Sequence, residues 1–279
     1  MRVTHHRASK PLPKSGMYSH YAYALWAALV LFTLASLRGF LPDTRARAIT
    51  AGLGWIAFSI HWFMQPEKYI EGMDPFNAIL TFAMANFCLL VAFSFMTDYR
   101  ESFFLLTRVT AIACIFYFPF AEVPVLHDAL ISLNTHCITD AGRTVFGVRM
   151  ALDDPYIYLN DHRVRLILGC TAIESMALFT GVILGVKAPL ERKAAAFLVS
   201  IPVIFVLNIL RNIFVITAYG YGWFDGWLGL DSFYVAHNIL AKIGSTIALI
   251  IIAYAILKIL PEVLDMIERL WDDMKSVLL

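Results

Sequence analysis

Three residues in the second half of the chain have types and spacing suited to thiol chemistry: Cys170 in LGCTAIES, Arg211 in NILRNIF and His237 in VAHNILAK. A thiolate is a strong nucleophile, and a helix N-terminus with a cation or His nearby stabilises it. A fixed guanidinium stabilises a tetrahedral oxyanion, and an imidazole accepts and returns a proton near neutral pH. These residues therefore predict attack on a carbonyl group, with Cys170 as nucleophile, Arg211 as oxyanion stabiliser and His237 as general acid and base.

Each of these residues also has a structural interpretation. Cys170 fits a small buried hydrophobic residue or a disulfide with Cys137. Arg211 is compatible with a buried ion pair to Glu174, and an interfacial His such as His237 is often only solvated. The polar residues expected to support the site are Glu174, Asn208, Asn212, Asn238 and Lys242, although membrane Asn residues also bond between helices and Lys242 is equally suited to a lipid head group.

The elements that position these residues are membrane helices. Hydrophobic residues make up 59% of the 279 residues and charged residues 15%, against about 45–50% and about 25% in ordinary soluble proteins, so a soluble globular protein is excluded. The net charge of +1 gives no case for nucleic acid. We expect one all-α polytopic membrane domain over residues 1–279, with seven or eight transmembrane helices. The apolar runs are Tyr21–Leu37, Ala48–Met64, Pro75–Met96, Phe103–Phe120, Leu166–Val186, Ala194–Tyr219 and Tyr234–Leu260.

Four further regions of this domain differ in composition. Residues 1–20 form a basic tail, and residues 121–165 are polar enough for a small extracytoplasmic cap. Within the cap, the stretch TVFGVRMALDDPYIYLND favours a short hairpin or an irregular cap. Residues 166–260 hold the candidate active-site helices, and residues 261–279 have the pattern of an amphipathic helix that lies at the inner interface or packs on the bundle.

The distribution of Lys and Arg among short loops predicts the orientation. It places the C-terminus in the cytoplasm and the cap and active site at the extracytoplasmic face of the cell membrane, whereas the basic tail and the Arg residues of the cap favour the opposite. Because alternate spans run in opposite directions, Cys170, Arg211 and His237 meet at one membrane face in either orientation. The loops on the cytoplasmic side contain Arg38, Arg45, Arg47, Arg100, Arg108, Lys187, Arg192 and Lys193, and the opposing short loops contain only Lys68.

Other functions remain open on the residues alone. The sequence has no H-E-x-x-H zinc helix, G-x-S-x-G elbow or P-loop, and we expect neither a metal nor another cofactor. A transporter or lipid-handling channel would use Glu174, Arg211 and Lys242 to line a polar path, although no inverted repeat is visible. A structural partner in a membrane complex would need no close approach of these side chains.

Three segments together resemble a known family. GCTAIESMALFTGVI, NILRNIFVITAY and AHNILAKIGS, within about Leu166–Ile250, resemble the exosortase/archaeosortase family of polytopic membrane proteins. The resemblance implies a Cys, Arg and His site at the extracytoplasmic face, formed here by Cys170, Arg211 and His237. It also implies a thiol protease or transpeptidase that cleaves a C-terminal sorting signal on S-layer glycoproteins and other secreted proteins. Such a signal combines a Pro-Gly-Phe motif, a transmembrane helix and a basic tail, and the new C-terminus passes to a membrane lipid.

Overall fold

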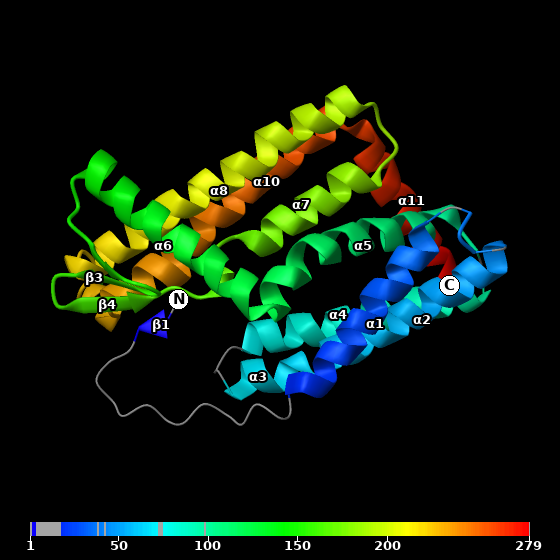
Figure 1. Ribbon diagram of the computed structural model, residues 1–279, viewed down its shortest axis with the longest axis horizontal. Helices are drawn as coiled ribbons and strands as arrows, with labels where there is room; N and C mark the ends of the chain where they lie inside the picture. The colour runs from blue at the N-terminus through cyan, green and yellow to red at the C-terminus, as the bar shows by residue number, and fades with distance from the viewer. Residues whose placement is uncertain are drawn as a thin grey trace. The chain divides into compact units, whose positions relative to one another are not determined.

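The computed structural model describes residues 2–3, 18–37, 39–41, 43–71, 75–97 and 99–278, and these residues are mostly helical (Figure 1). The chain forms two compact units. The site unit comprises Met1–Ser9, Phe116–Thr180 and Ala188–Pro261, and the helical unit comprises Lys10–Ile115, Gly181–Lys187 and Glu262–Leu279. Most of the expected basic tail lies outside the described residues.

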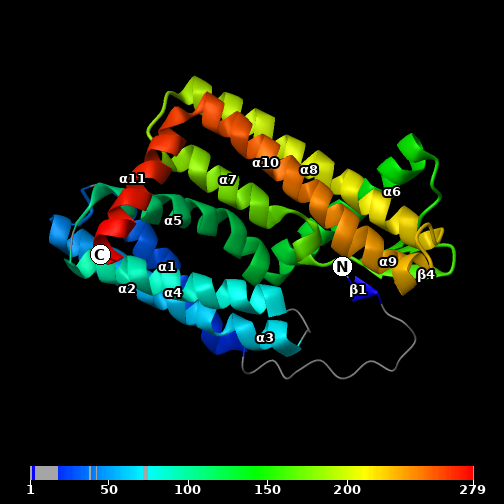
Figure 2. The ribbon, with the colours of Figure 1, turned by 180° about the vertical axis from the view of Figure 1, so that it is seen from behind.

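The helical unit is built around α2 (Thr44–Phe63), which packs against α1 (Tyr18–Ser36) on one side and α4 (Pro75–Thr97) on the other (Figure 2). The same unit contains α3 (Gln65–Glu71), most of α5 (Glu101–Glu122), the end of α7 (Ile173–Gly185) and nearly all of α11 (Pro261–Leu278).

Aromatic side chains form the core of the helical unit. The ring of Trp55 lies 4.9 Å from that of Phe32, and Phe58 packs edge-on against Phe32 at 5.7 Å. The indole nitrogen of Trp55 donates to the hydroxyl of Thr107 at 2.9 Å, which satisfies the one polar atom of a fully buried side chain. Regular helices that pack through aromatic rings therefore characterise this core.

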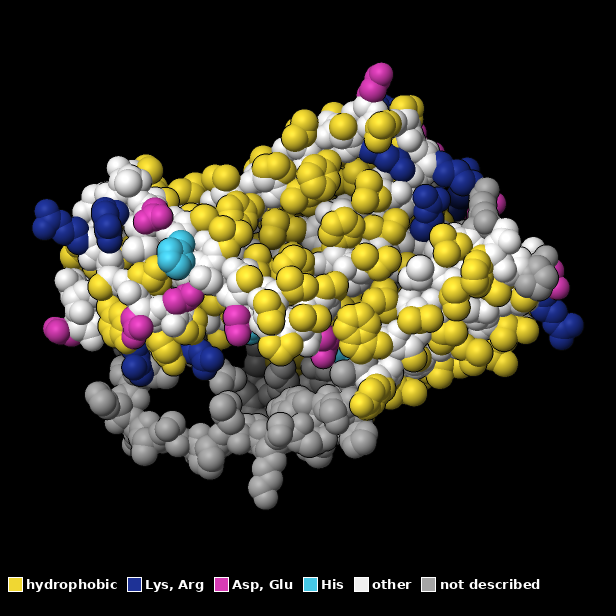
Figure 3. Space-filling view, in the orientation of Figure 1, with side chains coloured by type: hydrophobic (Ala, Val, Ile, Leu, Met, Phe, Trp, Pro, Cys, Tyr) yellow, Lys and Arg dark blue, Asp and Glu magenta, His cyan; other side chains and the backbone are white. Residues whose placement is uncertain are grey.

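The site unit begins with α6 (Pro124–Phe146), followed by an antiparallel sheet. The strands β2 (Ala151–Asp153), β3 (Tyr156–Leu159) and β4 (His162–Arg165) follow one another, and β1 (Arg2–Val3) adds to the β4 edge. Tyr158 faces Arg163 across β3 and β4. Among the described parts of this unit, Figure 3 shows charged side chains gathered near the sheet and hydrophobic side chains over the long helices.

Alternation along the strands gives the sheet a buried face. Ile157, Leu159 and Val164 are buried with Ile138 of α6 and Ile216 of α8 (Leu190–Gly220), whereas the guanidinium of Arg163 stacks on Tyr156 on the other face. The Asn160 side chain donates to the Gly220 carbonyl at 2.7 Å, which fixes the β3–β4 turn at the end of α8.

The remaining elements of the site unit lead into and out of α8. A 3₁₀ turn, η1 (Leu168–Cys170), precedes α7, and η2 (Trp227–Gly229) and α9 (Ser232–Tyr234) follow α8. A π-helix, η3 (Val235–Leu240), then continues into α10 (Ala241–Ile259). Figures 1 and 2 both show α8 and α10 side by side, and the two helices are in contact.

The structure supports a mostly helical membrane protein but does not confirm seven or eight spans. Within the described residues, four helices are long and apolar enough to cross a membrane: Phe76–Thr97, Glu101–Glu122, Leu190–Gly220 and Ser232–Ile259. The apolar helices Tyr23–Ser36 and Ile173–Gly185 are shorter, and α2 mixes its apolar residues with Arg45, Arg47 and His61. All seven apolar runs nevertheless contain helices.

The polar stretch at residues 121–165 contains the expected hairpin but also a helix that the sequence analysis missed. Residues 124–146 form α6, a helix with polar residues in its buried face. Asn134 and Thr135 are fully buried; the Asn134 amide donates to the Leu130 carbonyl, and the Thr135 hydroxyl donates to Asp154 of the β2–β3 turn. Because both side chains donate a hydrogen bond inside the unit, they interrupt the apolar period without breaking the helix.

Candidate active site

Cys170 lies at the end of η1, three residues before α7, and is almost completely buried. Its carbonyl oxygen accepts two hydrogen bonds from α8, from the amide nitrogens of Asn208 at 2.7 Å and Asn212 at 2.9 Å. Residues four apart lie on one face of a helix, which lets both amides reach one oxygen. The Asn pair therefore fixes the backbone of Cys170 against α8.

Arg211 stands between these two Asn residues on the same helix. Its Nη2 lies 3.5 Å from the Nδ1 of His237 on η3. The structure thus brings Arg211 together with His237, 26 residues further along the chain, and places it between the two Asn residues that bond to the backbone of Cys170, 41 residues before it. The π-helical turn at η3 is a local irregularity of the kind that recurs at functional sites.

A chain of ring contacts connects His237 to the sheet. Its imidazole stacks on Phe233 at 5.1 Å with 21° between the planes. Phe233 packs edge-on against Tyr219 at 5.4 Å, and Tyr219 packs against His162 of β4 at 4.3 Å. Through these contacts, the sheet and the end of α8 restrict the orientation of the His237 ring.

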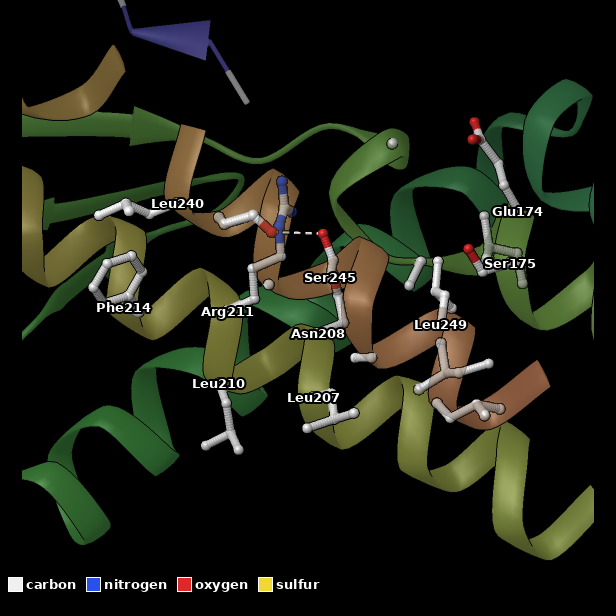
Figure 4. Close-up of a pocket in the computed structure, with 18 of the residues that line it drawn as sticks. Glu174, Ser175, Leu207, Asn208, Leu210, Arg211, Phe214, Leu240, Ser245 and Leu249 are labelled. Carbon is white, nitrogen blue, oxygen red and sulfur yellow. Dashed lines mark hydrogen bonds between the residues drawn. The ribbon is translucent and has the colours of Figure 1, made fainter. Parts of the chain in front are cut away.

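A cavity of about 660 Å³ lies beside the Arg211 side chain, among α7, α8 and α10 (Figure 4). Asn208 and Arg211 line it from α8, Ser245 lines it from α10 and Glu174 from α7. Leu168, Gly169 and Ala172 line it on either side of Cys170, and an added Cβ at Gly169 would meet no atom within 4 Å.

The supporting residues divide into two groups. Asn208 and Asn212 bond to Cys170, as described above, whereas Asn238 and Lys242 line a separate, smaller hollow. Glu174 is exposed and accepts a hydrogen bond from the Tyr117 hydroxyl at 3.4 Å. In the described part of the chain, no ion pair joins Glu174 to Arg211.

Two buried polar atoms at the site have no hydrogen-bond partner among the described residues: the Nε of Arg211 and the Oδ1 of Asn212. A buried donor without an acceptor costs about 1–3 kcal/mol. An incoming oxygen atom at Arg211 would relieve that cost, so the guanidinium is suited to receive a carbonyl or oxyanion.

All four cysteines are free thiols, so Cys137 and Cys170 form no disulfide in this structure. Within the described residues there is no cluster of three or more His, Cys, Asp or Glu side chains that could hold a metal ion.

The sequence analysis missed several parts of the site. It did not identify the Phe233, Tyr219 and His162 contacts, because an aromatic residue in an apolar run carries no signal of its partner. It also missed Ala172, which has a left-handed backbone with φ of +58° directly after the Cys170 turn. A residue other than glycine is uncommon in the left-handed backbone region, and its strain costs of order 1–3 kcal/mol.

Comparison of the chain with known proteins identifies its family. The fold and the membrane-spanning helices define a polytopic helical membrane protein, and the profile of the transmembrane exosortase family matches residues 14–242. Archaeosortase A of Natronomonas pharaonis is 31% identical over 89% of this chain and 86% of its own length. Archaeosortase A of Haloferax volcanii is 25% identical over 80% of this chain and 83% of its own. No solved structure matches the chain. The chain belongs to the transmembrane exosortase family, as the resemblance of its three segments had indicated.

Proposed function

We propose that this protein is a membrane-embedded thiol transpeptidase that cleaves the C-terminal sorting signal of secreted surface proteins. The family and the archaeosortase A relatives support a membrane enzyme that processes proteins. The finer assignment, to Pro-Gly-Phe signals on proteins such as S-layer glycoproteins and to lipid attachment, extends what the family resemblance implies. The observation that carries the proposal is the position of Arg211, which lies 3.5 Å from the His237 Nδ1 and between the two Asn residues of α8 that bond to the Cys170 carbonyl.

In the proposed reaction, His237 takes the proton of the Cys170 thiol, and the sulfur attacks the substrate carbonyl. Arg211 donates hydrogen bonds to the resulting oxyanion, a role worth about 10²–10³ in turnover at other sites. The C–N bond then breaks, His237 returns its proton to the leaving amine, and a thioester with Cys170 remains. An amine-bearing lipid attacks the thioester, which forms an amide and releases the thiol; water would give a free carboxylate instead.

The buried position of Cys170 requires a local shift before attack. Gly169, directly before it, is exposed beside the cavity, and the left-handed Ala172 lies two residues after it. We expect the Cys170 side chain to rotate toward the cavity and present the sulfur to the substrate, while the Asn208 and Asn212 bonds hold its backbone. In this proposal the sheet end of the site unit lies at the extracytoplasmic face.

The first experiment co-expresses a substrate carrying a Pro-Gly-Phe sorting tail with the native chain or with Cys170→Ala. Intact mass measures the loss of the tail and the gain of a lipid. We expect processing by the native chain and none by Cys170→Ala. The matched control is Cys114→Ala, a buried cysteine in the helical unit, which should leave processing intact. Equal processing by native and Cys170→Ala chains would exclude the thiol mechanism.

The transporter interpretation predicts a function that does not depend on Cys170. It needs Glu174, Arg211 and Lys242 but not Cys170, whereas Lys242 lines a different hollow from the other two. Processing that depends on Cys170 and survives Lys242→Gln would therefore favour the enzyme.

A further inference from the structure

The cavity beside Arg211 has the guanidinium at one end and aliphatic side chains from α8 and α10 at the other. On α8 its lining runs from Arg211 back to Ile204, and on α10 it runs from Ala241 to Ile252. Because α8 and α10 lie side by side and the chain reverses between them, Arg211 lies near the start of α10, and Ile204, Leu249 and Ile252 lie further along. Ser175 and the exposed Glu174 of α7 line the cavity on the same side of Arg211 as Leu249 (Figure 4).

This cavity is long enough for the hydrocarbon chain of a lipid. Ala241 and Ile252 are eleven residues apart, so the α10 lining is about 16 Å long. Small residues keep the channel open along α10: an added Cβ at Gly244 would meet no atom within 4 Å.

The polar end has unused hydrogen-bonding groups. The Nε of Arg211 is buried without a partner among the described residues. Asn208, which is 7% exposed, uses its amide nitrogen for the Cys170 carbonyl, and no described residue donates to its amide oxygen. An occupant with a polar head and an apolar tail would satisfy these groups and fill the apolar length.

We propose that this cavity binds one hydrocarbon chain of a membrane lipid, with the polar head of the lipid beside Arg211. The lipid comes from the surrounding bilayer, because α8 and α10 are both long and apolar enough to span it. In a second step, which rests on the proposed function, the bound lipid is the acceptor. Its head-group amine attacks the Cys170 thioester, the C–N bond forms as the C–S bond breaks, and the thiol regains a proton.

Binding is tested with the full chain in vesicles that contain an amine-bearing phospholipid with a diazirine at the end of one chain. After irradiation, mass spectrometry maps the adducts. We expect adducts at Ile204, Leu249 and Ile252, and at least a tenfold loss of them in Gly244→Phe, about the discrimination of a filled apolar pocket. Ile250→Phe adds the same ring to an exposed position of α10 outside the cavity and should leave labelling unchanged.

Two results would overturn the binding proposal. One is labelling that favours the outer residues Ile250 and Ile251 over the cavity residues. The other is Gly244→Phe labelled like the native chain, with a thermal melt showing that it is folded. Ala248→Leu, which also fills the cavity from α10, repeats the test if Gly244→Phe is unstable.

The product of the cleavage assay separates this inference from the proposed function. If the cavity holds the acceptor lipid, Gly244→Phe still removes the sorting tail but yields a free carboxylate in place of the lipid adduct. If Gly244→Phe instead loses tail removal and keeps the lipid labelling of the native chain, the cavity holds the substrate helix. That result would overturn the inference. Cys170→Ala should label like the native chain; if that variant also processes substrate, the proposed function fails while the lipid site stands.

Discussion

Both units are built from apolar helices, but they differ in how regular their backbones are. In the helical unit, α1, α2 and α4 are regular and meet through aromatic rings, and the buried Trp55 has its hydrogen bond. In the site unit, a 3₁₀ turn, a π-helix and two left-handed residues other than glycine, Asn160 and Ala172, interrupt the regular pattern. Irregular backbone costs free energy, so its concentration in one unit indicates where structure serves chemistry more than stability.

The distribution of paired charges supports this contrast. Asp273 of α11 accepts bonds from Arg100 at 2.7 Å and from Ser102 at 2.5 Å, all within the helical unit. Arg47 of the same unit donates to the Ala35 carbonyl and stacks on Phe104. Arg211 in the site unit has only a 3.5 Å contact with His237 and a buried Nε without a partner among the described residues. In the proposed function, this guanidinium receives the oxygen of the substrate.

The largest effect predicted from this comparison comes from Arg211→Lys. A Lys keeps the charge but loses the planar array of donors, so we expect turnover to fall about 10²–10³-fold with little loss of stability. Arg47→Lys is the matched change in the helical unit; it should lower the melting temperature while turnover per folded molecule stays near native. The measurements are tail removal by intact mass and thermal unfolding in detergent. Near-native turnover of Arg211→Lys would eliminate the oriented-oxyanion role.

A smaller effect concerns stability in the helical unit. At Gly181 of α7, an added Cβ would lie 2.6 Å from the Val109 carbonyl oxygen and 2.8 Å from the Ala113 Cβ of α5. We expect Gly181→Ala to destabilise the protein by about 1–3 kcal/mol through overpacking.

Gly52→Ala is the control for Gly181→Ala. Its nearest contact is an ordinary 3.5 Å to Phe95, so Ala should be tolerated or should add up to about 1 kcal/mol through helix propensity. Unfolding curves of the two variants decide the matter: equal stability would show that α7 and α5 can move apart at no cost.

These contrasts also explain what the sequence could and could not predict. Continuous apolar runs locate the helices of both units, because burial in lipid requires them. The three candidate site residues were predicted because polar residues in such runs are rare enough to need an explanation. The partners that position them were not: Phe233 is one of 21 Phe residues, and nothing in its neighbourhood marks it as the residue that stacks on His237.

The helix α6 shows that a whole element can also escape prediction from the local sequence pattern. Its buried Asn134 donates to the Leu130 carbonyl, and its buried Thr135 donates to Asp154, a partner 19 residues away that no local pattern reveals. Local periodicity therefore predicts elements whose faces are uniform. Tertiary hydrogen bonds determine the elements whose faces are mixed, and in this chain those elements surround the candidate site.

The smallest predicted effect tests whether the ring contacts position His237. Phe233→Ala removes the stack at 5.1 Å, an interaction worth about 0.5–1.5 kcal/mol, so turnover should fall about two- to tenfold. Phe233→Tyr keeps the ring and should restore turnover, which a loss of folding alone would not explain. Phe82→Ala removes an exposed aromatic pair with Phe63 in the helical unit and should leave turnover unchanged. If Phe233→Ala instead matches the native rate while Phe82→Ala slows it, the two units do not divide stability and chemistry in this way.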